Sequence, residues 1–412
     1  RALESTHDPE SALAGEIVHH ALLGGEPQLA VTAAIAAGHR CLRLFAYTEA
    51  LNVARQGLQI AETLPENLGI STQVELLHVI AMSRTSVKER FAWQPRVEKL
   101  LSEARARGLN REASLAAHVM AILYADNENF GPAADMTIQS AEMIRKDDPI
   151  TAVGRIANTG RCLIFIQRDV ERGRILIDEA QALAVQARIE HTEIPLGLGY
   201  YYAHVGDDAR AIPELERAHA SAAREQDHWR EWISMMRLAT LALERHDAAN
   251  ALRYCERLAP IATKMTGGSE GPVSEALTAL ARIISGEAVE IEEKLDLLRE
   301  IDSKGDLAYA LVYLAELDRD AGEVDRARQR AEEALQAAEM VDRRTEAALA
   351  RSLLAEIASN AALLQPALAA AQWDDLTKRA QDRVTAAAAR LNIRSSQKKE
   401  KKDGAHRSRT NV

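Results

Sequence analysis

The chain has 412 residues, of which 47% are hydrophobic and only 4% aromatic, and alanine alone occupies 75 positions. Alanine and leucine have the highest helix propensities, whereas β-sandwiches and barrels depend on β-branched and aromatic residues. The formal net charge is 51 − 61 = −10, which argues against a general nucleic-acid or acidic-membrane surface. The composition therefore excludes a β-rich fold and, for most of the chain, disorder.

Residues 1–46 are expected to form a helical lead-in. Within them, Glu16, His19 and His20 stand at positions i, i+3 and i+4, so a helix would place them on one face. A metal or acid–base cluster uses these residue types, but the His-Glu-x-x-His zinc spacing is absent and no third ligand set is evident. We therefore interpret the two histidines as a structural pair.

Residues 47–360 carry a repeated pattern of small and large residues. In its clearest unit, small residues allow two helices to approach closely and a Gly-Asp turn joins them; the unit comprises Leu198, Gly199, Tyr202, Gly206, Asp207, Ala211, Leu215 and Ala218. One position recurs at spacings of 40, 38, 40, 40 and 36 residues, as Ala133, Gly173, Ala211, Ala251, Ile291 and Ala327. Such a period indicates stacked helical hairpins.

The pattern is looser before residue 133, where we expect one hairpin formed by residues 72–85 and 95–107. A possible break in the array falls at residues 266–272, which lack the Gly-Lys-Ser/Thr ending of a P-loop and are interpreted as a connection. Residues 361–393 should cap the stack. Residues 394–412 hold seven Lys/Arg and two Asp/Glu without an apolar period, which predicts a disordered basic tail.

The repeat register resembles that of tetratricopeptide repeats. This resemblance implies an all-α fold, a right-handed α-solenoid of antiparallel helix pairs whose first helices line a concave groove. Transferred by register, the groove-lining candidates are His118, Arg161, Phe165, Tyr200, His204, Thr240, Tyr309 and Arg319. Their cationic, aromatic and polar groups suit an elongated ligand with polar and apolar parts. The alternative is that they line the groove without a dedicated ligand.

The start of the chain resembles part of another family, the bacterial signal-transducing ATPases, which include MalT-like, LuxR-type and SARP-type regulators. The similarity is to the helical region that follows their ATPase core, and it is carried by Leu13–His20, Gly24–Pro27, Ala36–His39, Leu44–Leu51 and Gly57–Leu58. It implies a sensor or scaffold region that holds a linked ATPase in check. The chain has no Walker A sequence, so such an ATPase would have to precede Arg1.

The three cysteines, Cys41, Cys162 and Cys255, lie far apart within apolar patterns. An odd, dispersed set predicts buried thiols in a reducing compartment, with neither a disulfide framework nor a metal site. The least charged stretch, residues 357–373, is too short and too interrupted to span a membrane. We therefore expect a cytoplasmic protein that uses no cofactor or metal.

One further cluster of chemically active residues lies at 227–232. Asp227 and His228, beside Trp229 and Trp232, are interpreted as the start of a helix with aromatic packing. With no catalytic arrangement evident, we predict that the chain is not an enzyme. The alternative is a catalytic site within the helical array, which would need a closed polar pocket with strongly shifted pKa values.

These patterns predict a non-enzymatic module that binds a protein, a peptide or a small effector in its groove and regulates a linked ATPase or transcription module. The alternative function is a free-standing peptide-binding receptor or an assembly scaffold. Neither function involves a membrane, and self-association is compatible with both. The net charge of −10 disfavours nucleic-acid binding through this chain.

Overall fold

The computed structural model describes residues 25–83, 86–145, 147–265, 268–368 and 373–391, and these contain helices and no strand. The first helices of successive pairs are α2 (Pro27–Arg43), α4 (Glu66–Met82), α7 (Asn110–Asp126), α9 (Pro149–Phe165), α11 (Glu193–His204), α13 (His228–Glu244), α15 (Glu270–Ile284), α17 (Lys304–Asp320) and α19 (Arg344–Ile357). The second helices are α3 (Tyr47–Ala61), α6 (Gln94–Ala106), α8 (Phe130–Ile144), α10 (Val170–Ala187), α12 (Asp208–Glu225), α14 (Ala248–Ala262), α16 (Glu292–Glu300) and α18 (Val324–Met340).

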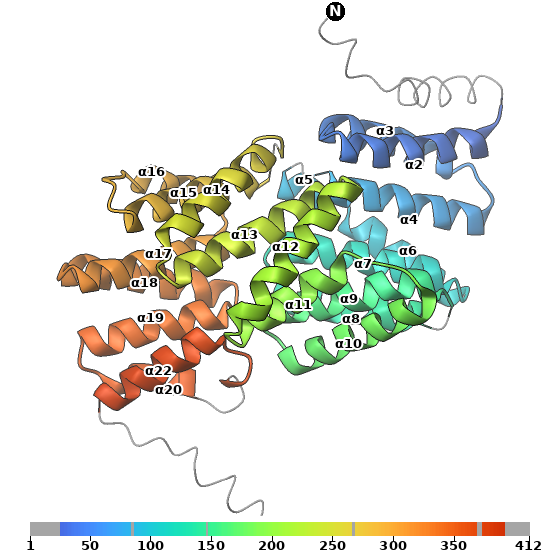
Figure 1. Ribbon diagram of the computed structural model, residues 1–412. Helices are drawn as coiled ribbons and strands as arrows, with labels where there is room; N and C mark the ends of the chain where they lie inside the picture. The colour runs from blue at the N-terminus through green and yellow to red at the C-terminus, as the bar shows by residue number, and fades with distance from the viewer. Residues whose placement is uncertain (1–24, 84–85, 146, 266–267, 369–372, 392–412) are drawn as a thin grey trace, which may run out of the picture.

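Each pair is an antiparallel hairpin that packs on the next, and together they form a right-handed α-solenoid, as the sequence predicts (Figure 1). The stack ends with a 3₁₀ helix η1 (Ala361–Leu364), α20 (Gln365–Leu368) and α22 (Lys378–Arg390), and α22 packs on α19. In the parts that the structure describes, no helix is both long enough and apolar enough to cross a bilayer.

The residues that mark the sequence repeat occupy equivalent places in the structure. Most lie in the first turn of the second helices α8, α10, α12, α14 and α18, and Ile291 immediately precedes α16. All are buried: Ala133, Gly173, Ala211, Ala251, Ile291 and Ala327. One close approach is between α9 and α10, where a Cβ added to Gly160 would lie 2.5 Å from the carbonyl oxygen of Gly173. Small residues in the repeat therefore mark contacts between helices, as expected.

The looser stretch of the sequence also folds as a hairpin, α4 with α6, and the short helix α5 (Val87–Phe91) lies in its connection. The expected boundary after residue 46 falls between α2 and α3, which form one hairpin. At the expected break, α14 packs directly on α15. Residues 266–267, the histidine pair at 19–20 and the basic tail lie outside the described residues.

The three cysteines differ in burial, and residues 227–232 begin a helix. Cys255 is buried as expected, whereas Cys41 and Cys162 are only half-buried. The Asp227 carboxylate accepts a hydrogen bond from the Arg230 N–H at 2.9 Å and so caps the start of α13. The expected helix start is therefore confirmed.

The superhelix contacts itself after five helix pairs. Glu128, just after α7, accepts hydrogen bonds from the backbone N–H groups of Lys304 (3.0 Å) and Gly305 (2.8 Å) at the start of α17. Gln167, just after α9, accepts one from the Thr345 N–H at the start of α19, at 2.7 Å. In both cases the helix that donates the hydrogen bond lies five helix pairs further along the chain.

The same offset recurs at both ends of this series. Phe45, after α2, stacks on the His228 ring at the start of α13 with ring centroids 3.5 Å apart. Gly206, after α11, lies against the side chain of Lys378 at the start of α22. We call these four contacts the inter-turn contacts.

The residue at each inter-turn contact ends its helix in the left-handed backbone conformation, with φ values of 59° for Phe45, 52° for Glu128, 57° for Gln167 and 76° for Gly206. This conformation closes an α-helix and turns the chain sharply. It is costly for residues other than glycine. The three non-glycine side chains gain a contact with the neighbouring superhelical turn.

One inter-turn contact gives a direct test. Replacing Glu128 with alanine removes the acceptor for two N–H groups at the start of α17, so we expect stability to fall by about 0.5–2 kcal/mol, as for other helix caps. Hydrogen exchange at the amides of Lys304 and Gly305 should accelerate. The control is Glu323→Ala in the equivalent turn after α17, where the side chain is exposed. Equal exchange rates in both variants would contradict the assignment.

Candidate functional site

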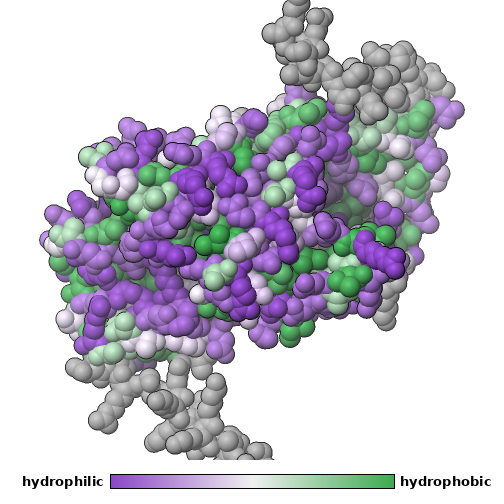
Figure 2. Space-filling model, viewed as in Figure 1, coloured by the Kyte–Doolittle hydropathy of each residue, from purple (hydrophilic) through white to green (hydrophobic). Residues whose placement is uncertain are grey.

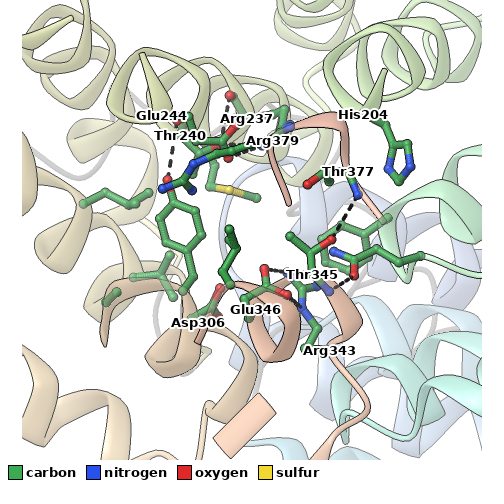
Figure 3. A pocket seen from close by; sticks show the side chains of 18 of the residues that line it. His204, Arg237, Thr240, Glu244, Asp306, Arg343, Thr345, Glu346, Thr377 and Arg379 are labelled. Atoms are coloured by element: carbon green, nitrogen blue, oxygen red, sulfur yellow. Dashed lines mark hydrogen bonds and ion pairs between the residues drawn. The ribbon is translucent and has the colours of Figure 1, made fainter. Parts of the chain in front are cut away.

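The candidate site is a pocket on the inner side of the superhelix, lined by helices from α9 to α22 (Figure 3). Its volume is about 110 Å³. One wall is apolar and is formed mainly by Val273, Ala276, Leu277, Leu280, Leu298 and Leu349. Charged and hydroxyl groups enter from several sides: Arg237, Thr240, Glu244 and Arg379 lie together, Asp306, Arg343, Thr345 and Glu346 lie across the pocket from them, and Thr377 lies between (Figure 3).

Three arginines enter the pocket, each paired with a carboxylate. Nη1 of Arg237 lies 3.1 Å from Glu244, and Nη2 of Arg343 lies 2.9 Å from Glu346. Arg379 pairs with Glu316. Burial alone would lower the pKa of Arg237, but the Glu244 carboxylate, together with Tyr200 and Tyr309, outweighs burial and raises that pKa. The arginines are therefore charged and held in fixed positions.

The aromatic and imidazole groups of the pocket are uncharged at neutral pH. Burial raises the pKa of Tyr200 to about 12, and it lowers the pKa of His204 to about 4, with a further contribution from Arg237. The Tyr309 hydroxyl donates to the carbonyl oxygen of Thr240 at 3.4 Å. These rings add apolar surface and hydrogen-bonding groups without adding charge.

The segment before α22 closes one side of the pocket. Thr377 donates its backbone N–H to Oγ1 of Thr345 at 3.2 Å, and Asp375 pairs with Arg344. Thr345 also makes the inter-turn contact with Gln167, and all three of Gln167, Thr345 and Thr377 line the pocket. The pocket therefore lies where two superhelical turns and the end of the array meet.

Of the eight groove-lining residues predicted from the register, the structure brings five together in this pocket: Phe165, Tyr200, His204, Thr240 and Tyr309. They come from α9, α11, α13 and α17. The Phe165 and Tyr200 rings meet edge to face, with centroids 6.0 Å apart. The register thus placed these side chains on a common surface.

The other three predicted residues lie elsewhere. His118 is on α7 beside His78, with ring centroids 5.7 Å apart. Arg319 pairs with Asp320 and with Glu356 of α19. Arg161 is buried in an ion-pair cluster. None of the three residues lines the pocket.

The Arg161 cluster is centred on Glu193, whose side chain is only 1% exposed. One carboxylate oxygen lies 2.9 Å from Nε of Arg161 and the other lies 2.7 Å from Nε of Arg230. The Arg161 guanidinium also lies over the Trp229 ring, 5.0 Å from its centroid. Arg161 therefore joins α9, α11 and α13 and is not available to a ligand.

Sequence reasoning missed the pocket arginines. Arg343 precedes α19 at the end of the repeat array, and Arg379 lies in α22, which the sequence analysis assigns to capping the stack. Arg237 is on a first helix but at a position that the register did not select. Arg343 and Arg379 stand at the starts of α19 and α22, where a basic residue is a common surface feature.

The fold defines this chain as a tetratricopeptide-like α-solenoid. A solved structure of a Rap protein complexed with Competence and Sporulation Factor is similar to it, with a TM-score of 0.51 and 12% sequence identity over 82% of this chain and 100% of the other. The apo form of the quorum sensor NprR from B. thuringiensis has a TM-score of 0.47 and 11% identity over 88% of this chain and 98% of the other.

At these identities the likeness concerns the fold alone. No protein-family model matches the chain, and no curated protein matches it. The resemblance of the first sixty residues to the signal-transducing ATPases stays a prediction from the sequence.

Proposed function

We propose that this chain is a peptide-sensing receptor whose pocket anchors one end of a peptide. The observation that carries the proposal is the pairing of an apolar wall with three fixed arginines on the inner side of the superhelix. A peptide terminus offers an apolar side chain, a carboxylate and backbone polar groups close together. Arginine recognises carboxylates through paired hydrogen bonds.

The size of the pocket limits what it can hold. An apolar cavity of about 150 Å³ takes up one benzene molecule, so about 110 Å³ corresponds to one side chain with its backbone groups. The rest of a peptide would extend along the concave surface. Its carboxylate would compete with Glu244 or Glu346 for an arginine that is already oriented.

The comparison with the Rap protein supports this proposal, because a similar solenoid forms a complex with Competence and Sporulation Factor. It favours a receptor of the free-standing kind over the regulatory part of an ATPase. A free-standing receptor should bind its peptide with the present chain alone. A requirement for a linked ATPase module would favour the second function, which rests on the sequence resemblance of residues 13–58.

The test is a screen of the full chain against a library of short peptides, with binding measured by fluorescence anisotropy and thermal shift. A bound peptide should raise the melting temperature by mass action. Ala276→Leu adds side-chain volume to the apolar wall and should weaken binding by at least about tenfold, since one extra methylene group already changes pocket affinity by that order.

The matched control for this screen is Ala220→Leu, on the exposed face of α12, which should bind the peptide as the unmodified chain does. Peptides that bind equally well to both variants would place their site outside the pocket and overturn the proposal.

A further inference from the structure

Three histidines lie on the first helices of the first three helix pairs, at sequence separations of 39 and 40 residues. His39 and His78 occupy the same position in α2 and α4, and His118 lies one helical turn earlier in α7. Their rings follow one another, with centroids 6.0 Å apart between His39 and His78 and 5.7 Å apart between His78 and His118. The repeat period therefore places imidazoles side by side.

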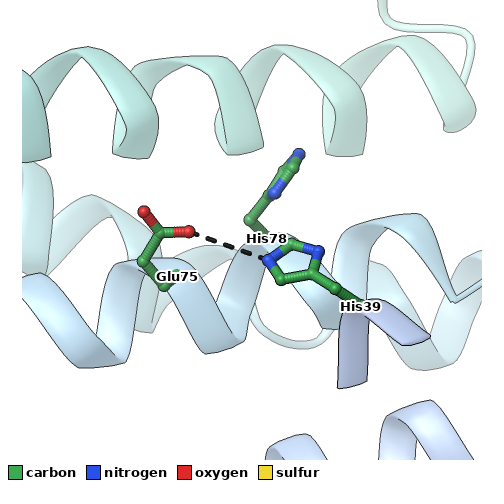
Figure 4. Close-up of side chains that lie close together, drawn as sticks. All are labelled: His39, Glu75 and His78. Carbon is green, nitrogen blue, oxygen red and sulfur yellow. Dashed lines mark ion pairs between the residues drawn. The ribbon is translucent and has the colours of Figure 1, made fainter. Parts of the chain in front are cut away.

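A carboxylate completes this group. Glu75 lies one helical turn before His78 on α4, and its Oε2 is 3.9 Å from Nε2 of His39 (Figure 4). One potential ligand atom from each of His39, Glu75 and His78 lies within 4.8 Å of the other two. All three side chains are partly accessible, so an ion could enter from solvent.

We propose that His39, Glu75 and His78 bind a divalent transition-metal ion, with Zn²⁺ as the ion that fits best. Zinc takes imidazole nitrogen and carboxylate oxygen at about 2.0–2.2 Å in tetrahedral geometry, which sets neighbouring ligand atoms about 3.4 Å apart. The three groups already lie near this spacing, and rotation of the side chains would bring them onto the ion. A water molecule would take the fourth position.

The charges around the cluster affect which ion it selects. Arg111 of α7 acts on Glu75, and Arg155 of α9 and Arg230 of α13 act on His78. These cations oppose any bound ion, and Glu75 supplies the one negative ligand. Magnesium and calcium depend on several oxygen ligands, whereas zinc binds well to imidazole. The site should therefore discriminate strongly against Mg²⁺.

The site lies away from the proposed peptide pocket and does not depend on it. The ligands come from α2 and α4, whereas the pocket is lined by helices from α9 onward. A bound ion would cross-link the first two helix pairs. Its effect should therefore appear as stabilisation of the N-terminal end of the solenoid.

The experiment is a calorimetric titration of the chelator-treated full chain with Zn²⁺, together with melting curves. We expect one ion per chain, a higher melting temperature with Zn²⁺, and neither effect with Mg²⁺. The variants Glu75→Gln and His78→Gln should each weaken zinc binding by at least about tenfold. His219→Gln on α12, which removes a half-buried histidine outside the cluster, should bind as the unmodified chain does.

Two results would overturn the proposal. One is the lack of zinc binding to the folded chain. The other is binding that is unchanged in Glu75→Gln and His78→Gln but lost in the double variant His19→Gln, His20→Gln, because the ion would then be held near the N-terminus. Circular dichroism of each variant checks that the helices are retained, and Glu75→Gln nearly preserves the shape of the side chain.

Discussion

Replacing Glu193 with glutamine should lower the free energy of unfolding by about 3–5 kcal/mol, the cost of removing one partner from a buried ion pair. The Glu193 carboxylate is almost fully buried and contacts Arg161 at 2.9 Å and Arg230 at 2.7 Å. The variant would leave the Arg161 guanidinium, itself only 3% exposed, without its charged partner. Urea-induced unfolding followed by circular dichroism measures the effect.

The same carboxylate predicts a pH dependence. Burial alone would raise the pKa of Glu193, but Arg161 and Arg230 outweigh it and lower that pKa to about 2, from an ordinary value of 4.5. A carboxyl group whose pKa is lower in the folded state stabilises the fold above its unfolded pKa. This contribution should be complete above about pH 4.5 and lost as the pH falls towards 2.

The control for both measurements is Glu190→Gln, three residues earlier and exposed, which should change stability little. Over the acid range, the Glu193→Gln variant should lose less stability than the unmodified chain. If Glu193→Gln and Glu190→Gln had equal stabilities, the ion-pair cluster would not contribute to the fold as we infer.

Replacing Gly160 with alanine should destabilise the protein by about 1–3 kcal/mol, the range found for overpacked cores. The added Cβ would lie 2.5 Å from the carbonyl oxygen of Gly173 and 2.7 Å from Cγ1 of Ile177. A backbone carbonyl cannot rotate out of the way as a side chain can, so α9 and α10 would have to separate. Thermal unfolding gives the measurement.

The matched control is Gly131→Ala in α8, where nothing lies within 4 Å of the added methyl group. That substitution should leave stability unchanged or raise it by up to about 1 kcal/mol, because alanine has the higher helix propensity. Opposite signs for the two glycines would confirm that packing decides the outcome. A neutral Gly160→Ala variant would mean that the helices are further apart than described.

The helical hairpins and their register could be predicted from the sequence because the residues that determine them lie close together along the chain. A small residue such as Ala211 or Gly173 must recur wherever two helices of a hairpin meet, and the turns need residues that end a helix. Both signals lie within some forty residues of one another. The same logic located Phe165, Tyr200 and Tyr309 on the inner surface.

The pocket itself could not be read in this way. It depends on how far each pair rotates relative to the previous one, and small rotations add up over five pairs before Gln167 meets Thr345. No residue spacing in the sequence indicates the total rotation over five pairs. Arg161 is the opposite case: the register assigns it to the groove, but its side chain forms an internal ion pair with Glu193.

The histidine group on α2 and α4 is different, because its signal was present in the sequence. His39, His78 and His118 recur at the repeat period, and the sequence reasoning used only His118, as a groove residue. A search for like residues about forty positions apart would have found the other two. In a repeat protein, residues one period apart are neighbours in space.

The inter-turn contacts also affect how the protein unfolds. In a simple repeat array each unit touches only its neighbours, so the ends can fray while the middle stays folded. Here α7 holds the start of α17 through Glu128, and α9 holds the start of α19 through Gln167. Loss of an early repeat would therefore release a late one, and the array should melt in a single step, as a globular domain does.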